Sequence, residues 1–349
     1  MRAGGISKRP HPAFSHLLPP AGEGQTAPAY HTSKPAMSDI PLNSQPQKRP
    51  RRWHIAVFLA PAVLVYTAIM IVPLVDTLRL SLFNTVDGQR GFVGLSNFIT
   101  LFFDERWSVS FWNALRNNTF FFLMHMLIQN PIGVALAAIL SVKSLKGVTF
   151  YRTSIFLPTM LSFVIVGFTW KLILSPLWGV TPSLLKSIGL GSLFSPWLGK
   201  EASALITLSL ISIWQYVGIP MMLIYAELLN IPEEVIEAAE LDGITGFSQF
   251  WKIKLPLILP TIGIISILTF VANFNAFDLI YSVQGALAGP NFASDILGTL
   301  LYRTFFGFQL QIGDQSMGAA IATMMFLIIL FGVLIYLFFV ERRMRRYQF

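Results

Sequence analysis

The polar segment most suited to a specific interaction begins at Asn230 and reads NIPEEVIEAAELDGITGFSQFWKIKLP. Glu233, Glu237 and Glu240 are spaced four and three residues apart, so on a helix they share one face and repel by about 0.3 kcal/mol per pair. A basic partner would relieve that repulsion. The alternative, an amphipathic loop lying on anionic lipid, would place this acidic face against like charge. The residue types therefore indicate docking to another protein.

The same segment carries the signals of a short surface helix from about residue 233 to residue 241. Pro232 suits the first turn, the glutamates that follow complement the positive end of the helix dipole, and Gly243 is a plausible stop. Ala238 and Ala239 add a small apolar face that permits close approach by another protein. We expect a docking helix that is followed by a turn.

Polar side chains also interrupt the apolar run that follows this segment. They lie among phenylalanines and toward the outer end of the run, and they are Asn273, Asn275, Asp278 and Tyr281. Polar groups at lipid depth are costly unless they face protein or water. Amide and aromatic groups together suit the hydroxyls and apolar faces of a sugar ring. The pattern predicts a substrate pathway, with hydrogen bonding between helices as the alternative.

A second polar group lies in the middle of an earlier apolar run and consists of Gln129, Asn130 and Pro131. A kink at the proline is the default interpretation, and pore lining is the alternative. His125, on the same run, is interpreted as a packing residue.

Catalytic and metal-binding chemistry finds no support in the residue pattern. The chain has 0 Cys residues, and it lacks H-E-x-x-H, G-x-S-x-G and paired intramembrane acids. It also lacks the G-x-x-x-x-G-K-[ST] loop of an ATPase. We therefore expect no catalytic residue, metal or cofactor. An ion-coupled secondary transporter remains an alternative, although the apolar runs are nearly free of charge.

The elements that position these residues are membrane helices, because the chain is 54% hydrophobic and only 12% charged, with a mean hydropathy of +0.62. Its basic residues cluster beside apolar runs, so its charge of +8 favours a membrane surface over nucleic acid. An all-α polytopic protein with six transmembrane helices is predicted. The six apolar runs cover residues 55–75, 117–142, 153–170, 202–226, 257–277 and 315–340.

The distribution of Lys and Arg predicts that both termini are cytoplasmic. The loop from Ser141 to Arg152 carries three basic residues and no acid, which marks it as an inner loop. Residues 1–52 are rich in Pro, Ser, Gly and His and are expected to form a disordered cytoplasmic extension before a membrane domain at 53–349. Met37 begins a short polar leader and is an alternative start to Met1.

The segment at about 230–256 resembles the EAA loop of permease subunits in bacterial ABC importers. The matching positions are Glu237, Ala238 and Ala239, then after three residues Gly243, then after nine residues Ile253, Lys254, Leu255 and Pro256. The resemblance extends over roughly residues 52–349 and is greatest to sugar permeases of the maltose and glycerol-phosphate types. One departure is GALAGP from Gly285 to Pro290, where such permeases often have a compact Gly-Gly-Pro turn.

The resemblance implies an inner-membrane subunit that imports a sugar or related polyol, with a permease for a non-sugar solute as the alternative. It implies that Glu237, Ala238, Ala239 and Gly243 couple the chain to the cytoplasm by docking in a cleft of an ATPase. The implied partners are two cytoplasmic ATP-binding subunits, a second permease subunit and an external solute-binding protein. A heterodimer of permease subunits is favoured, with a homodimer as the alternative.

Overall fold

The computed structural model describes residues 53–86, 89–309 and 312–341. The chain divides into two units, residues 1–59 and 60–349, and the architecture below is that of the second unit. The predicted disordered extension at 1–52 lies outside the described residues.

Within the described part of the chain, five helices are long and apolar enough to cross a membrane, or six if one bent pair counts as a single span. The prediction of a polytopic helical membrane protein is thereby confirmed. The uninterrupted candidate spans are Val57–Leu80, Glu105–Leu140, Glu201–Asn230, Gly246–Phe274 and Gln315–Phe338.

Each of these spans is assembled from shorter helices, and four of the joints or ends are π-helical turns, a feature that often occurs where a helix bends or carries function. The helices are α1 (Trp53–Tyr66) and α2 (Val72–Leu80), α4 (Glu105–Met124) and α5 (Asn130–Leu140), α9 (Glu201–Tyr216) and α10 (Gly218–Asn230), α12 (Gly246–Gln249) and α13 (Leu255–Phe274), and α16 (Gln315–Ile335). The π-helical turns are Thr67–Ile71, His125–Gln129, Phe250–Lys254 and Tyr336–Glu341.

The third predicted span, residues 153–170, is broken rather than continuous. Helix α6 (Val148–Phe156) continues into a 3₁₀ turn (Leu157–Met160), and α7 (Phe163–Ile173) then departs at 98°. Hydropathy identifies the apolar run but does not show that the helix axis changes direction within it. The break follows Pro158, which removes a backbone donor from the helix ladder.

The connections between spans contain structure that the all-α prediction did not include. A two-stranded antiparallel hairpin pairs β1 (Phe83–Val86) with β2 (Gln89–Phe92), in a register that places Phe83 opposite Phe92. The helical connectors are α3 (Ser96–Phe103), α8 (Val180–Ser187), α11 (Glu233–Leu241), α14 (Asp278–Gln284) and α15 (Leu297–Phe306), with 3₁₀ turns at Gly191–Leu193, Trp197–Gly199 and Pro290–Phe292.

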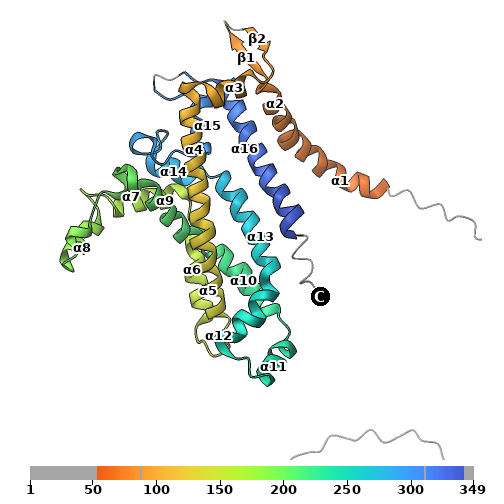
Figure 1. The fold of residues 1–349 in the computed structure, drawn as a ribbon, viewed down its shortest axis with the longest axis vertical. Helices are drawn as coiled ribbons and strands as arrows, with labels where there is room; N and C mark the ends of the chain where they lie inside the picture. The colour runs from red at the N-terminus through yellow and green to blue at the C-terminus, as the bar shows by residue number, and fades with distance from the viewer. Residues whose placement is uncertain (1–52, 87–88, 310–311, 342–349) are drawn as a thin grey trace, which may run out of the picture. The chain divides into compact units, whose positions relative to one another are not determined.

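Figure 1 shows α4, α13 and α16 packed side by side, with α11 and α12 at one end and the hairpin, α3 and α15 at the other. One apolar cluster joins α3 and α4 to α15 and α16, and another joins α5, α10 and α13. Many apolar side chains on the outer faces stay exposed, and no residue of α2 is buried. This distribution suits a lipid environment, in which the hydrophobic effect does not drive the burial of apolar side chains.

Candidate functional site

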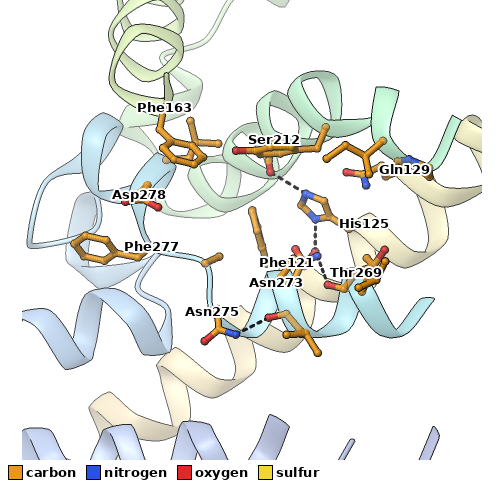
Figure 2. Close-up of a pocket in the computed structure, with 18 of the residues that line it drawn as sticks. Phe121, His125, Gln129, Phe163, Ser212, Thr269, Asn273, Asn275, Phe277 and Asp278 are labelled. Carbon is orange, nitrogen blue, oxygen red and sulfur yellow. Dashed lines mark hydrogen bonds between the residues drawn. The ribbon is translucent and has the colours of Figure 1, made fainter. Parts of the chain in front are cut away.

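A cavity of about 520 Å³ lies at the carboxyl-terminal end of α13, where it meets the second and fourth predicted spans. This volume falls within the range of about 300–1,000 Å³ that small-molecule sites occupy. Its walls are mostly apolar, with a few convergent polar groups (Figure 2). The polar lining residues are His125, Gln129, Ser212, Tyr216, Thr269, Asn273, Asn275 and Asp278.

Three of the four residues predicted for a substrate pathway line this cavity, namely Asn273, Asn275 and Asp278. They follow one another along the end of α13 and the start of α14, and Figure 2 shows all three among the residues that line the cavity. The fourth, Tyr281, is not among the lining residues. It lies one helical turn beyond Phe277, on which its ring stacks with centroids 4.9 Å apart.

Hydrogen bonding between helices, the alternative interpretation, occurs at Asn273 through its backbone and not through its side chain. The buried side chain donates from Nδ2 to the Thr269 carbonyl of its own helix at 2.7 Å, while the Asn273 carbonyl accepts from Asn118 Nδ2 of α4 at 3.0 Å. Asn275 is exposed and donates to the Val271 carbonyl, also within α13. The two side-chain amides therefore stabilise the end of their own helix while they line the cavity.

Of the polar residues in the middle of the second span, Asn130 makes a contact between helices and Gln129 lines the cavity. Asn130 exchanges hydrogen bonds with Thr269 Oγ1 at 3.2 and 3.3 Å, which ties this span to α13. Gln129 lines the cavity, and its buried Oε1 has no hydrogen-bond partner within the described part of the chain. An unpaired buried acceptor is costly, so Gln129 is a site where a hydroxyl of a bound ligand would be stabilising.

Both ring nitrogens of His125 have partners, as the packing interpretation requires. Nδ1 lies 2.8 Å from the Phe121 carbonyl, and Nε2 lies 2.9 Å from Ser212 Oγ (Figure 2). A carbonyl only accepts, so Nδ1 carries the proton and Nε2 accepts from the serine hydroxyl. Residue patterns alone did not indicate Ser212, because its partner lies 87 positions away in the chain.

The short acidic helix predicted between the fourth and fifth spans is confirmed as α11. It ends in a Schellman motif: the amide of Ile244 donates to the Ala239 carbonyl at 2.8 Å, and the amide of Gly243 donates to the Glu240 carbonyl at 3.0 Å. Gly243 has φ +74°, a left-handed conformation that glycine adopts without strain. The glycine is therefore required by the turn itself.

The four residues predicted for coupling divide into two groups according to exposure. Glu237, Ala238 and Gly243 are exposed, whereas Ala239 is buried. The exposed Ala238 adds little bulk to the outer surface of α11. Large apolar side chains surround this surface, with Leu241 90% and Phe247 78% exposed.

An ion pair joins α11 to the loop that follows the second span. Lys143 Nζ donates to Glu233 Oε1, and both side chains are largely exposed. The hydrogen bond and charge of the partner lower the pKa of Glu233 and raise the pKa of Lys143. Lys143 is also attracted by Glu237 and Glu240, so it partly relieves the repulsion along the acidic face.

Comparison with known proteins agrees with this architecture. Residues 129–346 match the model of the family described as "Binding-protein-dependent transport system inner membrane component". The chain is 33% identical to the probable ABC transporter permease protein YurN of Bacillus subtilis strain 168, over 78% of this chain and 91% of YurN. It is 31% identical to the multiple sugar-binding transport system permease protein MsmF of Streptococcus mutans, over 68% of this chain and 77% of MsmF.

The fold is also that of a solved transporter. A bacterial ABC transporter that imports the acidic polysaccharide alginate contains a chain that superposes with a TM-score of 0.69 at 22% identity, covering 85% of this chain and 96% of the other. The family match covers more than half of the sequence and includes α11 and most of the residues that line the cavity. The chain therefore belongs to the inner-membrane components of binding-protein-dependent transport systems, and it is a multi-pass permease of the inner membrane.

Proposed function

We propose that this permease forms the translocation pathway of an ATP-driven importer for a sugar or a related polyol. Relatives named for multiple sugars, lactose and arabinooligosaccharides share 27–31% of their residues with it. The cavity supports the same substrate class, because its amides and its carboxylate accept or donate hydrogen bonds while its aromatic rings contact the apolar faces of a sugar. Asn273, Asn275 and Asp278 are the proposed substrate contacts, and Tyr281 extends them outward.

The proposed partners are two cytoplasmic ATP-binding subunits, a second permease subunit that makes a heterodimer, and an external solute-binding protein. In this arrangement both termini and α11 face the cytoplasm. Glu237, Ala238 and Ala239 dock into a cleft of one ATP-binding subunit, and Gly243 allows the turn that follows them. The exposed acidic and apolar surface of α11 supports this role, because it suits a partner with basic and apolar groups.

The observation that carries the coupling mechanism is the continuity of the fifth span. Helix runs without a break from Gly246, three residues after the α11 turn, to Phe274 at the cavity. At 1.5 Å per residue, those 29 residues reach about 43 Å. A displacement of α11 by a closing ATPase can therefore reach the cavity wall along one helical span, which contains a π-helical turn at Phe250–Lys254. The movement of this span would exchange the inward and outward openings.

The experiment that tests coupling is co-purification of the complex with its ATP-binding subunit, followed by measurement of ATP hydrolysis stimulated by substrate. Glu237→Lys places a like charge against the proposed basic partner, so we expect loss of the ATP-binding subunit or of stimulation. Glu105→Lys, at an exposed acid in the first turn of α4 at the opposite end of the fold, is the matched control. Unchanged assembly and unchanged stimulated hydrolysis in Glu237→Lys would refute the proposal.

A non-sugar solute is the second candidate substrate. The chain is 29% identical to the osmoprotective compounds uptake permease protein GgtC of Synechocystis, over 78% of this chain. Titration of the external binding protein with sugars, polyols and charged osmolytes discriminates the candidates. Binding of a charged osmolyte without any sugar or polyol would contradict the sugar assignment while leaving the importer intact.

A further inference from the structure

An aromatic cluster stands immediately outside the cavity, at its outer rim. Phe277, Tyr281 and Tyr302 contact one another with ring centroids 4.9–5.3 Å apart, and the tyrosine hydroxyl oxygens are 3.5 Å apart. We call these three residues the rim cluster. Phe306 extends it outward at 5.2 Å from Tyr302 and is 70% exposed.

The rim cluster is continuous with the cavity. Phe277 both lines the cavity and stacks on Tyr281, so one ring belongs to both features. Asn275 and Asp278, which flank Phe277 in the chain, are exposed and offer amide and carboxylate oxygens beside the rings. A ligand that extends out of the cavity would therefore meet aromatic faces and hydrogen-bond acceptors together.

Buried polar contacts hold the two halves of the rim cluster in place. Arg303, the neighbour of Tyr302, donates from Nη2 to Asp295 Oδ2 at 2.7 Å and from Nη1 to the Ala286 carbonyl at 2.9 Å. Both members of this ion pair are nearly inaccessible, with 6% and 1% of their side-chain surfaces exposed. Helix α15 is thereby attached to the loop that follows α14.

A second contact attaches α15 to the end of α13. Asn118, fully buried on α4, donates to the Asn273 carbonyl at 3.0 Å and accepts from the Leu297 amide at 3.3 Å. The chain segments that carry Phe277 and Tyr302 are therefore tied to the same asparagine. A platform that is rigid before binding loses little entropy on binding, which is how aromatic surfaces gain affinity for a ligand.

We propose that the rim cluster is a second binding site for a sugar ring, so that this permease takes an oligosaccharide with one unit in the cavity and another on the rim. The inference rests on the proposed sugar importer. The chemistry favours a sugar over a lipid chain at this position, because a pyranose presents apolar C–H faces to Phe277 and Tyr302 while its hydroxyls reach the tyrosine hydroxyls and Asp278.

The test measures maximal uptake rates of glucose, maltose and maltotriose in proteoliposomes that contain the complete transporter with saturating external binding protein. Tyr302→Leu removes the ring, and Tyr302→Phe keeps it. Phe306→Leu changes a side chain that is mostly exposed and therefore spares the packed core. Phe103→Leu, at an 80% exposed aromatic residue of α3 outside the cluster, is the matched control.

We expect Tyr302→Leu to lower maltotriose uptake about threefold to tenfold while glucose uptake stays within about twofold, since one aromatic contact is lost. Phe306→Leu is expected to act in the same direction. Tyr302→Phe keeps the ring but loses one hydroxyl, so it should lower maltotriose uptake less than Tyr302→Leu does, whereas Phe103→Leu should stay near wild type. Equal losses of uptake for all three sugars in Tyr302→Leu, or no loss in either Tyr302→Leu or Phe306→Leu, would overturn the rim site. Wild-type uptake of glucose alone would overturn the rim site but not the sugar function, whereas an external binding protein that binds no sugar or polyol would overturn both.

Discussion

Substitution of Gly243 by alanine tests how much one backbone angle contributes to the proposed coupling between α11 and the ATP-binding subunit. With φ +74° and nothing within 4 Å of the position that a Cβ would occupy, Gly243→Ala introduces no steric clash. Only the left-handed backbone is strained, at about 1–2 kcal/mol. The reduced freedom of alanine in the unfolded turn offsets about 0.4–1 kcal/mol of this. A net cost of about 1 kcal/mol lowers the ratio of formed to unformed turn about fivefold.

The matched control is Gly189→Ala, because Gly189 has φ +77° and equally open surroundings but lies in a different connection. We expect Gly243→Ala to lower substrate-stimulated ATP hydrolysis of the reconstituted transporter severalfold. Gly243→Asn should lower it less, because asparagine tolerates the left-handed region. Gly189→Ala should leave it unchanged. Wild-type coupling in Gly243→Ala, or equal losses in both alanine variants, would refute the argument.

Three further outcomes are expected. Lys143→Glu should increase amide exchange in α11, and the swap with Glu233→Lys should restore protection. The hydrogen bond and the partner's charge lower the pKa of Glu233 and raise that of Lys143. The stabilisation that this pair gives to α11 is therefore fully present between the ordinary pKa values of the two groups, 4.5 and 10.5. It is lost as pH falls through the lowered pKa of Glu233 or rises through the raised pKa of Lys143. Equal amide exchange of α11 in the wild type, the single variant and the swapped variant would contradict this role of the ion pair. Arg303→Met should cost about 3–5 kcal/mol of unfolding free energy in detergent, because it leaves a buried carboxylate unpaired, and adding Asp295→Leu should recover much of the loss. No difference between the single and double variants would count against the buried ion pair. Gly218→Ala should destabilise the packing of α10 on α6 by about 1–3 kcal/mol, because its Cβ would lie 2.9 Å from the Ile155 carbonyl oxygen; a wild-type melting temperature would exclude that close contact.

The short acidic helix shows why local features were predictable. Pro232, the acidic first turn and Gly243 all act within a few residues, so their sequence order contains the information needed to begin and end a helix. Asn273, Asn275 and Asp278 were likewise found from their cost in lipid. Tyr281 was grouped with them as a polar residue of the same run, but it lies on α14, beyond the turn of the chain at Phe277, which has φ −153°.

The amino-acid order alone determined that this chain is a polytopic membrane protein with a short acidic surface helix, because hydrophobic length and helix caps are properties of contiguous residues. The tertiary structure decided the 98° break of the third span, the shape of the cavity and the buried Arg303–Asp295 pair. No local sequence pattern marks Arg303 as buried. Its burial depends on a loop that α4 holds through Asn117 and the Asp295 carbonyl, 178 positions apart, and pairings at that distance leave no local pattern.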